Sequence, residues 1–160
     1  MRIVTLVIIL IVFSFSVSAQ KEMDTVMNRC PVYITDTTGY NNYFLEFQPA
    51  TIHIDKAKGE LSVVVEQKDQ FFSMFFGKKH LENKVYKIKS SAKKNNEVAA
   101  KYSFKSGDQV SYVIVTSGTI ETNFNKETRL WNIKVNGILS NFVGTGVSYF
   151  KVKADFNIKG

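Results

Sequence analysis

Residues 150–159, just before the final glycine, read FKVKADFNIK. Apolar side chains occupy every second position of this stretch, from Phe150 to Ile158, and lysine, aspartate or asparagine stands between them. Successive side chains of a β-strand point to opposite faces of the sheet, so this alternation is typical of a strand with one buried face and one wet face. The stretch therefore predicts an antiparallel sheet with a solvated outer surface.

Shorter segments of the same kind recur along the chain with turn residues between them. Residues 55–59 predict a hairpin loop that ends at Gly59, because glycine tolerates the positive φ that such loops need. Residues 106–108 and 117–118 predict further turns, and residues 67–81 are ambiguous and would also suit a short helix. The expected strands span residues 32–35, 43–47, 51–55, 60–67, 98–105, 110–116, 119–124, 130–135, 138–143 and 150–159.

Strands at this spacing favour a sandwich or a barrel. The sequence thus predicts an all-β fold, a single-domain antiparallel β-sandwich or a small lipocalin-like barrel with roughly eight to ten strands. We expect this β domain to span residues 39–160, after an irregular N-terminal extension at residues 20–38 that holds one short strand. A membrane-spanning barrel is the alternative architecture, but several expected strands are shorter than the about 9–11 residues that it needs.

The first residues resemble an export signal. Arg2 precedes an apolar run at residues 3–13, and Val17 and Ala19 stand at the positions that a signal peptidase reads. A spanning helix needs about 20 apolar residues, and this run is shorter. We therefore expect residues 1–19 to be a cleaved signal peptide and the protein to be secreted or periplasmic, with an uncleaved membrane anchor as the alternative.

Charge and cysteine content set further bounds. The formal net charge of +7 suits anionic surfaces such as phospholipid headgroups, although it also serves plain solubility. Cys30 is the single cysteine, so no intramolecular disulfide is possible and the core must supply the stability. This thiol is either buried, free or paired with another chain.

The most unusual stretch is FFSMFF at residues 71–76, which two lysines and a histidine follow closely. One interpretation is a central strand that is buried on both faces. The other is a rim that enters a lipid interface or covers an apolar ligand, with the lysines meeting phosphate groups. A separate candidate is a tryptophan that either fills the core or stacks on a sugar ring. The candidate binding residues are Phe71, Phe72, Met74, Phe75, Phe76, Lys78, Lys79 and Trp131.

The chemistry-bearing residue types form no motif along the chain. His53 and His80 have no second ligand at metal spacing, and the G-x-S-x-G elbow of serine hydrolases is absent. We therefore predict no catalytic residue, no metal and no cofactor, and expect that the protein is not an enzyme. Arginine is rare in the basic middle of the chain, which together with export argues against a nucleic-acid partner.

These features predict an exported, non-enzymatic binding protein that carries a small apolar or lipid-like ligand. Its format is similar to that of small lipocalin-like carriers, since an eight-stranded barrel can enclose one apolar ligand. The alternative is a β-sandwich interaction module of the cell envelope or exterior that binds a protein or glycan. An enzyme of unrecognised type is a third possibility, and the oligomeric state is not indicated.

Overall fold

The structure, a computed structural model, describes residues 24–36, 48–57, 59–92, 94–143 and 146–159, with backbone only for residues 141–143. The described residues form strands and no helix, so the predicted all-β class is confirmed. The ten strands are β1 (Thr25–Met27), β2 (Val32–Asp36), β3 (Ala50–Ala57), β4 (Glu60–Gln67), β5 (Gln70–Phe76), β6 (Lys84–Ile88), β7 (Glu97–Ser106), β8 (Gln109–Asn125), β9 (Leu130–Val143) and β10 (Gly146–Lys159).

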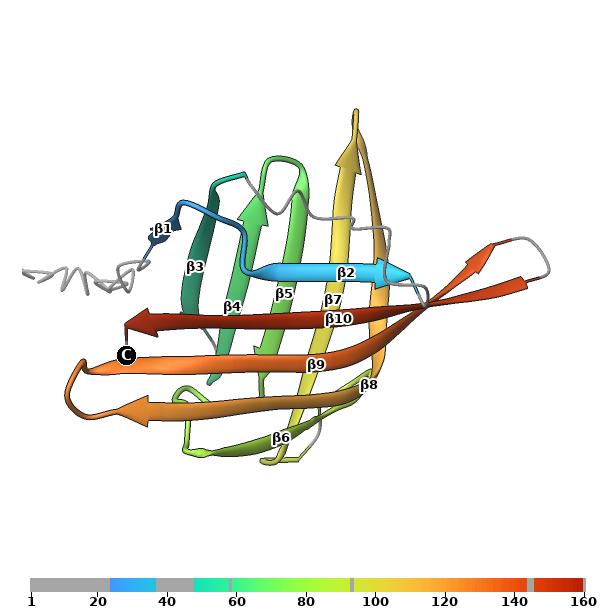
Figure 1. Cartoon of the computed structure of the whole chain (residues 1–160). Helices are drawn as coiled ribbons and strands as arrows, with labels where there is room; N and C mark the ends of the chain where they lie inside the picture. The colour runs from blue at the N-terminus through green and yellow to red at the C-terminus, as the bar shows by residue number, and fades with distance from the viewer. Residues whose placement is uncertain (1–23, 37–47, 58, 93, 144–145, 160) are drawn as a thin grey trace, which may run out of the picture.

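The strands are arranged as two layers that cross at a steep angle (Figure 1). Strands β3, β4, β5 and β7 run upright in the figure, and β2, β10, β9 and most of β8 run across them. All ten belong to one sheet, in the order β1-β3-β4-β5-β7-β6-β8-β9-β10-β2, with an additional β7–β8 pairing. The layers are therefore two parts of one sheet, which folds over on itself in the manner of orthogonally packed sheets.

The long strand β8 makes the corner between the layers. Its first part pairs with β7 up to Ile114, and its second part pairs with β9 from Val115 onwards. A register shift lies between Val115 and Ser117, and Gly118 follows with a φ of 133°. A bulge bends a strand and increases its twist, so residues 117–118 redirect β8 without ending it. The turn that was predicted there is thus a bend inside one strand.

The sheet is not closed, because β1 and β2 form its two edges. Both edges come from residues 20–38, the expected N-terminal extension: the short strand expected at residues 32–35 is confirmed as β2, whereas β1 was not predicted. Strand β1 pairs with β3, and β2 pairs with β10 over five residues from Val32 to Asp36. The sheet is also mixed, since β6 and β7 run parallel while the other pairs are antiparallel. The antiparallel prediction therefore holds for every pair but one.

The core lies between the two layers and forms a single cluster of buried side chains. In β10, Val152, Ala154, Phe156 and Ile158 are buried while the residues between them are exposed, as the alternation predicts. The ambiguous residues 67–81 hold strand β5, with no helix there. The expected strand at residues 43–47 and the expected signal peptide at residues 1–19 lie outside the described residues. None of the described residues forms a helix that could span a membrane.

Candidate functional site

A cleft of about 560 Å³ opens between the two layers, at the end where β7 turns into β8. Its walls come from both layers: Tyr102 and Phe104 from β7, Val113 from β8, and further apolar side chains from the strands that cross them. The cleft is thus bounded by side chains of two layers whose strands cross at a steep angle. The apolar lining residues are Ile34, Tyr102, Phe104, Val113, Leu139 and Phe150.

Polar groups gather at one end of this cleft, in the β4–β5 and β7–β8 turns. Asp69, Gln70, Lys105 and Ser106 line the cleft there. The backbone N–H of Lys105 donates to the carbonyl oxygen of Asp69 at 2.8 Å, which ties the two turns together. The Tyr102 hydroxyl donates to Gln70 Oε1 at 3.0 Å. The cleft thus has apolar walls and one polar end that hydrogen bonds hold in place. Small-molecule sites usually combine an apolar lining with a few polar groups in this way.

The opposite end of the core is filled. A cavity of only about 110 Å³ remains there, lined by Leu81, Trp131 and Ile158 together with neighbouring side chains that include Lys79. The rings of Phe124 and Trp131 lie 5.2 Å apart, and those of Phe76 and Tyr86 meet edge to face at 5.1 Å. Aromatic pairs at these distances add to the stabilisation from burial. Trp131 and Lys79 are therefore brought together, but at the packed end and away from the large cleft.

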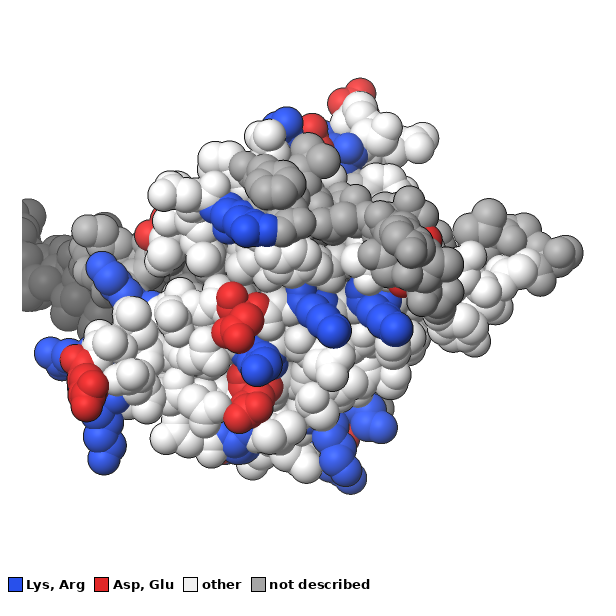
Figure 2. Space-filling model, viewed as in Figure 1, with Lys and Arg blue, Asp and Glu red and all other residues white. Residues whose placement is uncertain are grey.

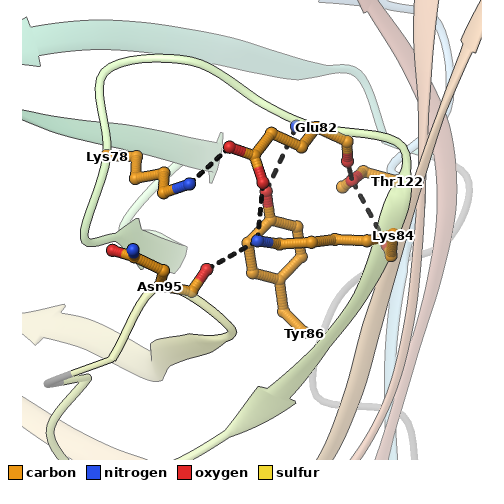
Figure 3. Close-up of polar contacts among 6 residues, drawn as sticks. All are labelled: Lys78, Glu82, Lys84, Tyr86, Asn95 and Thr122. Atoms are coloured by element: carbon orange, nitrogen blue, oxygen red, sulfur yellow. Dashed lines mark hydrogen bonds and ion pairs between the residues drawn. The ribbon is translucent and has the colours of Figure 1, made fainter.

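The loop between β5 and β6 covers the packed end and is fastened by Glu82 (Figure 3). The Glu82 carboxylate accepts a hydrogen bond from Lys78 and another from Lys84, the latter at 2.7 Å. These bonds from Lys78 and Lys84 lower the pKa of Glu82 to about 2, although burial opposes the shift. Glu82 is solvent-exposed, so this contact orders the loop more than it stabilises the fold.

The backbone of Glu82 is fixed as well. Its N–H donates to the Tyr86 hydroxyl at 3.2 Å, and its carbonyl oxygen accepts from the Thr122 hydroxyl at 2.6 Å. The Lys84 ammonium lies 4.8 Å from the centre of the Tyr86 ring and donates to the carbonyl oxygen of Asn95 at 2.7 Å. The buried Tyr86 and Thr122 thus have hydrogen-bond partners, as buried hydroxyls normally do. This cluster serves to close one end of the core.

The candidate residues of β5 divide between the two faces of the sheet. Phe72, Met74 and Phe76 are buried in the core between the layers. Phe71 and Phe75 point to the outer face, where they are half-buried, and the Lys101 ammonium lies 5.3 Å from the centre of the Phe75 ring. Of the eight predicted binding residues, none lines the large cleft among the described lining residues.

The outer face of the crossing layer is polar. Glu121 of β8 stands opposite Lys134 of β9, and Lys134 stands opposite Asp155 of β10. Figure 2 shows this alternation of acidic and basic side chains across the middle of the layer. A hollow of about 510 Å³ lies on this face, where Tyr33 and Lys153 line it together with the three charged residues. Opposite charges that face one another across strands stabilise a sheet.

His53 and Cys30 are two further side chains whose type could take part in acid–base or nucleophilic chemistry. His53 Nδ1 lies 2.7 Å from Asp24 Oδ1, and Nε2 lies 2.7 Å from Glu66 Oε2. Burial lowers the pKa of His53, but the two carboxylates outweigh it and the net shift is upward. Burial raises the pKa of the Cys30 thiol, which disfavours the reactive thiolate. Within the described ranges, no three side chains from His, Cys, Asp and Glu are placed to hold a metal ion.

Comparisons with known proteins do not indicate a family for this chain. No family model matches the chain, and no match to it is found among curated proteins or among solved structures. The cleft residues had no signal of their own in the sequence, because Tyr102 and Val113 alternate like any core residues. Phe104, Lys105 and Ser106 are exceptions, because they lie at or next to the predicted turn at residues 106–108 and binding residues concentrate at turns.

Proposed function

We propose that this protein is a non-enzymatic binding protein that carries a small apolar or lipid-like ligand in the cleft between its layers. The observation that carries the proposal is the cleft itself, with a volume of about 560 Å³ and apolar walls. Ligand sites in proteins have volumes of roughly 300–1,000 Å³ and are mostly apolar, with a few polar groups that set orientation. The volume and the lining both match that description.

The arrangement of the lining favours an amphiphile over a plain hydrocarbon. Ile34 and Leu139 are almost fully buried at the inner wall, so an apolar tail placed there is removed from water. Asp69, Lys105 and Ser106 stand together at the polar end, where a small headgroup can exchange hydrogen bonds with them. The proposed ligand is therefore a single-tailed molecule with a compact polar head.

We also propose that the protein acts outside the cytoplasm. The short apolar run at residues 3–13, followed by Val17 and Ala19, supports export with cleavage of the signal. N-terminal sequencing of the protein from the culture medium or periplasm tests this proposal, and an intact Met1 would contradict it.

The carrier proposal is tested by filling the cleft. Native mass spectrometry of the purified protein should show co-purified ligand, and a fluorescent fatty-acid probe should bind and be displaced by unlabelled fatty acid. Val113→Trp places a large ring in the cleft and should weaken probe binding by about tenfold or more, since the lost volume excludes the tail. Val85→Trp, at an exposed position of β6, is the matched control and should leave binding unchanged.

Equal probe binding by both tryptophan variants would overturn the proposal. Loss of binding by Val113→Trp counts only if its unfolding remains cooperative at a similar temperature, since a variant that fails to fold also loses the cleft. If Val113→Trp does not fold, Ser106→Trp repeats the test, because Ser106 lies at the exposed polar end of the cleft and its substitution affects the core less.

The outer face of the crossing layer supports a second candidate, an envelope or extracellular module that binds a glycan or protein. The hollow of about 510 Å³ combines the Tyr33 ring with charged and amide side chains, which are the groups that bind sugar hydroxyls. Glycan-array binding that Lys134→Ala abolishes and Val113→Trp preserves would favour this function over the carrier.

A further inference from the structure

His53 lies between two carboxylates on the outer face of the layer that β3, β4, β5 and β7 form. In β3 it alternates with the buried Ile52 and Ile54, so its ring points away from the core. Its Nδ1 atom lies 2.7 Å from Asp24 Oδ1, and its Nε2 atom lies 2.7 Å from Glu66 Oε2. One imidazole therefore contacts an acidic side chain with each of its ring nitrogens.

The register of the sheet brings these three side chains together. Asp24 immediately precedes β1, and the antiparallel register that pairs Thr25 with Ile52 places it opposite His53. Glu66 of β4 is a diagonal neighbour of His53 in the β3–β4 pairing, within reach of a histidine ring. The contact thus joins β4, β3 and the start of β1 across the edge of the sheet.

The protonation state of His53 decides whether both contacts can form. A neutral imidazole has one N–H donor and one acceptor nitrogen, whereas an ionised carboxylate only accepts. Both ring nitrogens can therefore donate to Asp24 and Glu66 only when the ring is a doubly protonated imidazolium. Burial lowers the pKa of His53, but the hydrogen bonds and charges of the two carboxylates outweigh it and raise the pKa above its ordinary value.

The strands beside His53 add no opposing charge. β1 contains no charged residue, and β4 contains only Glu60 and Glu66. In β3, Asp55 shares the outer face with His53, whereas Lys56 alternates to the other face. On these three described strands, no basic side chain therefore accompanies His53 among the carboxylates. Loss of the ring proton leaves like charges without the cation between them, which opposes the attachment of β1.

Few other contacts hold β1 in place. It is an edge strand of three residues, Thr25–Met27, and β3 is its one partner among the described strands. Met27 packs against the core. Further along the chain, the Cys30 N–H donates to the carbonyl oxygen of Gln48 at 2.9 Å and fastens the segment that follows β1 independently. Loss of the His53 contact can therefore free β1 and leave β2 in its place.

From this geometry we propose that His53 is a pH-sensitive latch, which fastens the edge strand β1 to β3 and β4 while its ring is doubly protonated and releases β1 when one proton leaves. Because the folded-state pKa is raised, the latch stabilises the edge fully below pH 6.5, and this contribution is lost as pH rises through the folded-state pKa. On release, β3 becomes the edge of the sheet, and its unpaired backbone groups are open to another strand. The latch goes beyond the carrier function, since none of its three residues is among the described residues that line the cleft.

A catalytic role suits this histidine less well. A general base needs a ring nitrogen that can accept a proton, and in the latched state both nitrogens of His53 donate hydrogen bonds instead. A switch needs only access to solvent protons. The His53 side chain is 24% exposed and that of Asp24 is 50% exposed, so water reaches the contact.

A pH titration followed by NMR tests the proposal. The imidazole signals of His53 and the methyl signals of Thr25 and Met27 are recorded on both sides of the ordinary histidine value of 6.5. We expect His53 to titrate above 6.5, and both methyl signals to move with the same midpoint toward the positions of an unstructured chain. His80→Gln removes the other histidine and is the control, which should leave this transition unchanged. Methyl signals that stay constant while His53 titrates would overturn the proposal.

Two substitutions separate the latch from other causes of a pH effect. His53→Gln removes the titrating group and should abolish the transition of the methyl signals. Glu66→Gln exchanges the carboxylate for an amide, which can donate to the lone pair of a neutral ring or accept from its N–H. This variant should keep β1 attached across the whole titration and shift the His53 midpoint downward. A transition that persists in His53→Gln, or an unchanged midpoint in Glu66→Gln, would show that the latch does not exist.

Discussion

The two ends of the core differ although the same crossing layers form both. At one end Phe76, Tyr86 and Trp131 fill the space and leave a cavity of about 110 Å³. At the other end Tyr102 and Phe104 line a cleft about five times as large, at 560 Å³. Close packing is the normal condition of a protein interior, so the open end is the exception that needs a reason.

The difference lies in what closes each end. The packed end is covered by the β5–β6 loop, which Glu82 fastens through Lys78 and Lys84 (Figure 3). At the open end the β4–β5 and β7–β8 turns are joined by one backbone hydrogen bond, from Lys105 to Asp69. The packed end therefore has both a filled core and an ordered loop over it, whereas the other end has a cleft between the layers. This separation is common where binding would conflict with tight packing.

The largest expected effect is at the packed end. Phe76→Ala should lower the free energy of unfolding by about 3–5 kcal/mol, because Phe76 is fully buried and its ring packs against Tyr86. Chemical denaturation followed by circular dichroism measures the loss. Phe75→Ala, in the same strand but half-buried on the outer face, should cost clearly less. Similar losses for both variants would show that the packed end is not the stabilising one.

The corner between the layers should be nearly as sensitive. A Cβ atom at Gly118 would lie 2.2 Å from the Asn136 carbonyl oxygen, and the φ of 133° is one that other residues rarely adopt. Gly118→Ala should therefore destabilise the fold by about 2–4 kcal/mol, from backbone strain and overpacking together. Gly107→Ala is the control, since a Cβ there meets nothing within 4 Å and only the strain of its φ of 59° remains. Equal melting temperatures for Gly118→Ala and the wild type would contradict the corner assignment.

Substitution at the open end should affect binding more than stability. Phe104 is 37% exposed at the rim of the cleft, so Phe104→Ser should change the free energy of unfolding by less than about 1 kcal/mol. The same variant should bind the fatty-acid probe several-fold more weakly, since it removes one aromatic wall. A large loss of stability with unchanged binding would reverse the proposed roles of the two ends.

The smallest effect should come from the loop contact of Glu82, and it should depend on pH. The folded-state pKa of Glu82 is about 2, below its ordinary value of 4.5, so its stabilising contribution is present above 4.5 and disappears as pH falls through about 2. Glu82→Gln should thus lower the melting temperature slightly at neutral pH, and its difference from the wild type should vanish near pH 2. A difference that is constant with pH would exclude the ion pairs as its source.

The sequence predicted those parts of the fold that depend on local alternation. Val152, Ala154, Phe156 and Ile158 are buried as expected, and the hairpin at Gly59 lies where its turn residue indicated. The corner was not predictable, because Ser117-Gly118 carries the same signal whether a strand turns back or bends and acquires a new partner. The strand at residues 71–76 could not be recognised from an alternation of apolar and polar residues, because phenylalanine occupies both faces of β5.

The cleft was beyond local prediction for a related reason. Ile34 and Phe150 come from β2 and β10, which are far in sequence from the β7–β8 hairpin of Tyr102 and Val113, and each residue follows the ordinary pattern of a core position. Whether such residues meet or enclose a space depends on the angle at which the layers cross, which is a property of the whole sheet. The exposure of Val110 and Tyr112 in the β7–β8 hairpin was not predictable either. Their alternation with polar residues is the same as that of buried strand positions, and only the structure shows that both are exposed.

The pairing of β2 with β10 has a consequence for the order in which the protein is made. Strand β2 belongs to the first described part of the chain, and its partner among the described strands, β10, is the last of them in chain order. Val32 and Ile34, which are buried in the folded protein, therefore have no strand to pair with until β10 has been synthesised. The edge of the sheet at β2 can therefore form only after β10 has been made, so this part of the fold assembles late.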